Sequence, residues 1–158
     1  MTNKQNAESI NAVVLPAKVT EIITPARDKE HKLPMFLESV SAGFPSPADD
    51  YIEGKLDLND YLIRNPSSTF YVRVTGESMI HAGIHSGDLL IVDRSITPKN
   101  NNIVIAVING ELLVKRIRIE KNEIKLVAEN PKFKSITINN EMSFEVWGVV
   151  TNVIHPLR

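Results

Sequence analysis

The sequence predicts a mostly β domain preceded by an extended N-terminal arm. Three observations support this prediction. From about residue 51 onward the chain has short runs rich in Val and Ile, turn residues separate these runs, and the first 50 residues mix charge with proline and sustain no helical period. Many short strands with frequent turns are typical of antiparallel barrels and sandwiches. The pattern does not specify the order of the strands.

The elements follow in chain order from their apolar patterns. Residues 51–63 are predicted as a short helix, because Ile52, Leu56 and Leu62 roughly share a face. Apolar runs predict strands at 70–75, 88–93, 103–108, 111–119, 123–128, 135–138 and 144–154. Between two of these runs, Asn109-Gly110 predicts a two-residue hairpin turn, since both residues tolerate positive φ.

Composition limits the class of protein. The 158 residues are 42% apolar and 23% charged with a net charge of −1, so no strong field favours nucleic acid or acidic lipid. The chain has no cysteine, which excludes disulfides, thiolate catalysis and most zinc sites. No run approaches the roughly 18 apolar residues of a membrane span, and Ile10–Leu15 makes a poor signal peptide. We expect a cytoplasmic protein without membrane contact and without a cofactor or metal.

The residues with the clearest chemistry are Ser78 and Lys115, 37 positions apart. A serine hydroxyl needs a base to become a nucleophile, and a lysine amine is a base only when burial keeps it neutral. Strand alternation puts Lys115 in a row with aliphatic residues at 113, 117 and 119, where a solvated lysine has no reason to lie. Two other interpretations stay open: Ser78 caps a short helix beginning near Met79, and Lys115 reaches water from the strand edge.

A third element is the Ala42-Gly43 pair, in a segment bordered by proline. Two small residues make an unhindered peptide bond, which a narrow protease cleft admits without steric cost. An Ala-Gly pair alone indicates nothing. Its significance depends on the segments around it.

Four segments, taken in order and with their spacing, resemble the UmuD proteins of the LexA-like self-cleaving peptidases. They are residues 42–51 (AGFPSPADDY), 74–80 (VTGESMI), 86–93 (SGDLLIVD) and 110–116 (GELLVKR). The resemblance covers about residues 42–158. It implies a β-rich catalytic domain with short helices, of the LexA and signal-peptidase type, at 43–158, and a regulatory arm at 1–42 that self-cleavage removes.

The resemblance also implies roles for individual residues. Ser78 matches the nucleophile, Lys115 the general base, and Ala42-Gly43 the scissile bond. It implies a serine endopeptidase that forms a homodimer and cuts itself when a RecA filament on single-stranded DNA stimulates it. The processed form would then act in SOS mutagenesis as a subunit of an error-prone translesion polymerase, with a UmuC-like partner.

The chain departs from the family pattern in two ways. UmuD proteins often have cysteine before the scissile glycine, whereas Ala42 follows the LexA choice. The arm is also longer than is usual, and residues 1 to about 30 match nothing in the pattern.

Other functions fit less well. A LexA-like repressor needs a DNA-reading domain before the cut, but residues 1–42 carry five basic and five acidic residues with prolines at 16, 25 and 34, so we expect no sequence-specific DNA binding. A signal peptidase needs a membrane anchor, and no run in this sequence is long and apolar enough to be one. A non-catalytic binding module would have no use for Lys115 in its apolar row.

His81, His85 and Asp88 suggest a metal site. Glycines at 83 and 87 break any helix that would align these side chains, so no metal site is expected.

Overall fold

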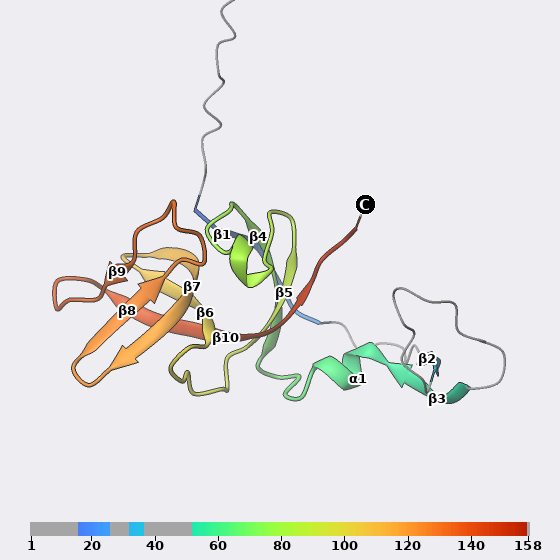
Figure 1. The fold of residues 1–158 in the computed structure, drawn as a ribbon. Coiled ribbons are helices and arrows are strands. Elements are labelled where there is room, and N and C mark those ends of the chain that lie inside the picture. The colour runs from blue at the N-terminus through green and yellow to red at the C-terminus, as the bar shows by residue number, and fades with distance from the viewer. Residues whose placement is uncertain (1–15, 26–31, 37–51, 158) are drawn as a thin grey trace, which may run out of the picture.

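The computed structural model describes residues 16–25, 32–36 and 52–157 (Figure 1). The main element is one eight-stranded sheet in the order β1-β4-β5-β10-β6-β7-β8-β9. Its strands are β1 (Lys18–Ile23), β4 (Thr69–Thr75), β5 (Leu89–Asp93), β6 (Ile103–Ile108), β7 (Glu111–Glu120), β8 (Glu123–Val127), β9 (Ile136–Thr137) and β10 (Phe144–Ile154). All pairings in this sheet are antiparallel.

Strand β1 closes the sheet into a barrel-like shape. It pairs along its length with β4, from Lys18 opposite Thr75 to Ile23 opposite Tyr71. At Lys18 it also pairs with Leu113 of β7, on the other side of the sheet. The segment Lys18–Ile23, predicted only as part of an extended arm, is therefore a strand of the main sheet.

Two apolar clusters fill the interior. The first lies between β4, β5 and Ala17, which precedes β1, and its buried residues are Ala17, Val72, Val74, Met79, Ile84, Leu90, Val92, Ile105 and Val114. The second lies beneath β6, β7 and β8, and its buried residues are Val104, Ala106, Ile108, Leu113, Ile117, Leu126 and Val149. Trp147 packs against the first cluster, with its ring centroid 5.3 Å from that of Phe70.

The predicted strands are confirmed, and the one predicted helix is mostly wrong. Strand β10 has the bounds that the sequence predicts, and both residues of the predicted turn, Asn109 and Gly110, have positive φ (50° and 85°). Residues 52–57, predicted as helical, form β3 (Ile52–Asp57), which pairs with β2 (Lys32–Phe36) in a separate two-stranded sheet. Only α1 (Leu58–Leu62) is helical there, where the Asp57 side chain caps it by accepting from the Asn59 N–H at 2.8 Å.

Figure 1 shows β2, β3 and α1 to one side of the main sheet. The connection from β2 to β3, residues 37–51, contains Ala42 and Gly43 and lies outside the described residues. No helix in the described part of the chain is long and apolar enough to cross a membrane.

Candidate active site

Ser78 lies in the connection between β4 and the short 3-10 helix η1 (Ile80–Ala82), and it is fully buried. Gly76 turns the chain out of β4 with a φ of 94°, a conformation that favours glycine. On the other side of Ser78, the Met79 side chain is fully buried in the first apolar cluster. No side chain caps η1, so the interpretation of Ser78 as a helix cap is wrong.

Lys115 lies on β7 with its amine directed at Ser78. Its side chain is 3% exposed, so the alternative in which it reaches water is also wrong. Nζ of Lys115 lies 2.9 Å from Oγ of Ser78, a buried hydrogen bond between strand β7 and the connection that follows β4. Burial lowers the pKa of Lys115 from 10.5 to about 8, because the low-dielectric interior disfavours the ammonium. The structure therefore brings the predicted nucleophile and the predicted base together.

The loop that carries Ser78 is held by Asn130, which the sequence analysis missed. Asn130 is buried, and its Nδ2 donates to the Glu77 carbonyl oxygen at 2.9 Å. The His81 N–H donates to the Glu129 carbonyl oxygen at 2.9 Å. These two bonds fix both sides of Ser78 against the 129–133 connection. The only local sign of this role in the sequence is the Asn130-Pro131 pair, which is typical of a turn.

A second missed residue, Ala17, occupies the space above Ser78. Its side chain is 1% exposed, and its N–H donates to Oγ of Ser78 at 2.9 Å. The Ala17 carbonyl oxygen accepts from the Val114 N–H at 3.4 Å, so the segment pairs with β7 next to Lys115. We call the space that Ala17 occupies here, between Ser78 and strand β7, the groove above Ser78.

Backbone donors are also present near the hydroxyl. Within the described residues, the N–H groups of Ser78 and Met79 have no hydrogen-bond acceptor. Free N–H groups next to a nucleophile are the kind of donor that stabilises a developing oxyanion.

Histidine and aspartate side chains gather at a second place. His85, Asp88 and His155 bring their possible ligand atoms within 4.8 Å of one another, and such a set could hold a zinc ion. The sequence analysis weighed His81, His85 and Asp88 as a group, whereas the structure groups His155 with His85 and Asp88 and leaves His81 outside. Nδ1 of His155 lies 2.6 Å from Oδ1 of the buried Asp88, so a direct hydrogen bond accounts for the contact. That bond joins the segment after β10 to the turn before β5.

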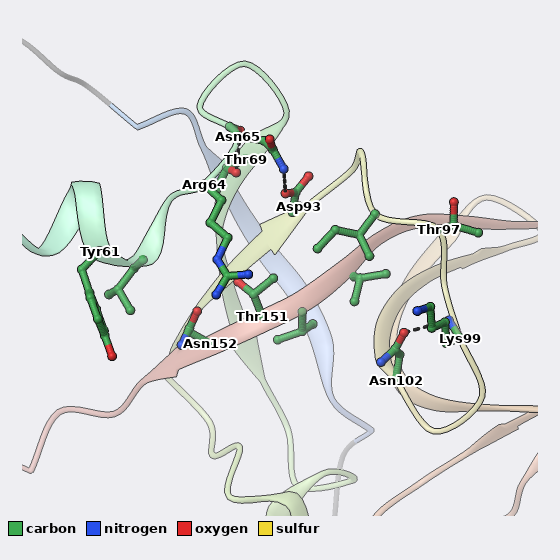
Figure 2. Close-up of a pocket in the computed structure, with 14 residues that line it drawn as sticks. Tyr61, Arg64, Asn65, Thr69, Asp93, Thr97, Lys99, Asn102, Thr151 and Asn152 are labelled. Atoms are coloured by element: carbon green, nitrogen blue, oxygen red, sulfur yellow. Dashed lines mark hydrogen bonds between the residues drawn. The ribbon is translucent and has the colours of Figure 1, made fainter.

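A polar pocket of about 650 Å³ lies between the end of α1, the ends of β4 and β5, and β10 (Figure 2). Neither Ser78 nor Lys115 lines it. Burial would raise the pKa of its Asp93, but hydrogen bonds from Ser95, Asn65 and Ser68 outweigh burial and lower that pKa. Because Oδ2 accepts from Asn65 at 2.7 Å and Oδ1 from Ser95 Oγ at 2.6 Å, this carboxylate serves to hold loops together.

Comparisons with known proteins agree with the resemblance seen in the sequence. The Peptidase S24-like family model matches residues 34–151. ImpA of Escherichia coli is 45% identical over 135 residues, which are 85% of this chain and 91% of ImpA. SamA of Salmonella typhimurium is 46% identical over 125 residues (79% and 86%), and MucA of Escherichia coli is 42% identical over 130 residues (80% and 88%). The chain therefore belongs to the Peptidase S24-like family of self-cleaving serine peptidases, as a UmuD-like member of the LexA group.

Proposed function

We propose that Ser78 and Lys115 form a catalytic dyad that cuts the chain's own Ala42-Gly43 bond. The observation that carries the proposal is the buried 2.9 Å contact between Nζ of Lys115 and Oγ of Ser78. A serine and a lysine in this arrangement are an established variant of the nucleophile and base pair. The lowered pKa of Lys115 makes its amine a competent base near neutral pH.

The reaction has two steps. In the first, neutral Lys115 takes the Ser78 proton as Oγ bonds to the Ala42 carbonyl carbon, and the N–H groups of Ser78 and Met79 donate to the oxyanion. The C–N bond then breaks, Lys115 returns the proton to the Gly43 nitrogen, and Ala42 stays esterified to Ser78. In the second step, Lys115 deprotonates a water that attacks the ester and returns that proton to Ser78 Oγ as the ester C–O bond breaks. The new acid at Ala42 then loses its proton to solvent and becomes a carboxylate.

The groove suits the proposed substrate. It already accommodates the Ala17 methyl group at 1% exposure, so a second alanine fits the same space. Because the substrate is tethered to the dyad in the same dimer, its effective concentration is high even though its intrinsic affinity is weak.

The proposed biological role follows from the family. Residues 1–42 form a regulatory arm and 43–158 the working domain. A RecA filament on single-stranded DNA stimulates the cut during the SOS response. The processed homodimer then serves in the cytoplasm as a subunit of an error-prone translesion polymerase, with a UmuC-like partner. We find no observation that favours the LexA-like repressor: within residues 1–42, the described segments 18–23 and 32–36 are strands.

The test is a comparison of intact masses. The purified chain is incubated with RecA and an ATP analogue, with and without single-stranded DNA. We expect fragments 1–42 and 43–158, formed faster when the DNA is present. Cleavage that does not respond to the filament would refute the RecA-dependent part, and failure of the 43–158 product to bind a UmuC-like polymerase would refute the partnership.

A further inference from the structure

The groove above Ser78 is filled by a segment that differs from the proposed substrate. Ala17 occupies it, 25 positions before Ala42, and residues 18–23 continue from there as β1 along β4. The Ala17 N–H donates to Ser78 Oγ at 2.9 Å, and the Ala17 carbonyl oxygen accepts from the Val114 N–H at 3.4 Å. A β-carbon added to Gly76 would lie 2.2 Å from the Pro16 carbonyl oxygen, so this segment packs directly on the Gly76 backbone.

The bound peptide is not presented for attack. All described peptide bonds are trans, and in a trans peptide the N–H and C=O point in opposite directions. Since the Ala17 N–H points at Oγ, the Pro16 carbonyl oxygen points away from the serine. Productive binding requires the carbonyl carbon to face the nucleophile. The N–H also engages a lone pair of Oγ, the atom that has to attack.

Several contacts hold this segment in the groove. Strand β1 pairs with β4 over its whole length and with β7 at Lys18. Exposed ion pairs flank it: Nζ of Lys18 lies 3.3 Å from Glu111, and Nε of Arg73 lies 3.1 Å from Glu21. Such exposed pairs contribute little to the docking, because water screens them. The backbone pairing and the buried Ala17 therefore account for most of the docking.

We propose that Pro16–Ile23 is a built-in competitor for the catalytic groove: it covers Ser78 in a non-productive arrangement, and Ala42-Gly43 gains access only when this segment leaves. The inference rests on the proposed self-cleavage. A substrate that competes with an occupant reacts at a rate proportional to the fraction of time that the groove is free. Weakening the segment should therefore accelerate cleavage.

The first test replaces Ala17 by a side chain that the groove cannot contain. Ala17→Trp should speed RecA-independent cleavage of the full chain by at least about fivefold, because the groove becomes free more often. Thr24→Trp is the matched control, since it adds the same bulk at an exposed position just after β1 and should leave the rate unchanged. Glu21→Arg, a surface change that reverses one ion pair, should give a smaller acceleration.

The second test does not depend on cleavage. In full-length chain carrying Gly43→Glu to prevent cutting, hydrogen exchange of residues 16–23 should be strongly protected, and Ala17→Trp should remove that protection. Free exchange of the segment in the parent chain would overturn the inference. So would an Ala17→Trp chain that keeps its fold by circular dichroism but cleaves no faster than the parent. If the parent never cuts at Ala42-Gly43, the proposed function fails, and exchange alone decides whether the segment occupies the groove.

Discussion

The buried amine of Lys115 gives the proposed self-cleavage a characteristic pH dependence. Burial lowers its pKa from 10.5 to about 8. A general base works only when it is neutral, so the rate follows the neutral fraction of this amine. For a pKa of about 8, that fraction is about 9% at pH 7, about 50% at pH 8 and about 91% at pH 9.

Raising the pH from 7 to 9 should thus accelerate cleavage about tenfold, followed by a plateau. A lysine with its ordinary pKa would instead give a rate that rises roughly tenfold per pH unit to about pH 10. The plateau is therefore the informative part of the profile.

The assay uses the purified full chain without RecA, in buffers of constant ionic strength from pH 6 to about pH 10. Products are quantified by intact mass, and circular dichroism at each pH verifies that the fold persists. Arg118→Ala is a suitable control, since this exposed residue lies on the same strand and its loss should leave the profile unchanged. A flat profile, or a rise without a plateau, would refute Lys115 as a base whose pKa is lowered by burial.

Three substitutions test other parts of the account. Asn130→Asp keeps the size of the side chain but removes the N–H that holds the Glu77 carbonyl oxygen. Cleavage should slow severalfold, while the midpoint of its pH profile stays in place. A shifted midpoint would contradict a positioning role for Asn130. Gly43→Glu should abolish cutting by crowding the leaving side, and a normal 43–158 product by mass spectrometry would show that the cut lies elsewhere. Lys115→Met should raise the free energy of unfolding at pH 7 by up to about 3 kcal/mol, because a shift from 10.5 to about 8 measures the cost of burying the ammonium. The folded lysine loses its proton near pH 8 and the unfolded one near 10.5, so this gain should fade between those values in denaturant titrations.

The sequence predicts much of the fold because local patterns are sufficient for many of its strands. Strand β10 and the turn at Asn109-Gly110 follow from alternation and from tolerance of positive φ. The error at Ile52–Asp57 has a long-range cause, since those residues are extended because they pair with Lys32–Phe36. A window around residue 52 contains no information about that partner.

At the site, too, local patterns are informative and contacts between residues distant in the sequence are not predictable. The aliphatic row around Lys115 favours burial but leaves open that its amine reaches water, and the pairing with Ser78 is implied by the resemblance to the UmuD proteins. The contact from Ala17 spans 61 positions and that from Asn130 spans 53, and neither residue has a distinctive local pattern. Such partners become visible only when the barrel closes.

The central claim is that Ser78 and Lys115 together cut the Ala42-Gly43 bond. Its most direct test is the intact mass of parent, Ser78→Ala and Lys115→Ala chains after prolonged incubation at about pH 9, where the amine is mostly neutral. We expect the parent to give fragments that end at Ala42 and begin at Gly43, while both variants stay whole. The same fragments from either variant, or a parent chain cut only at another bond, would contradict the claim.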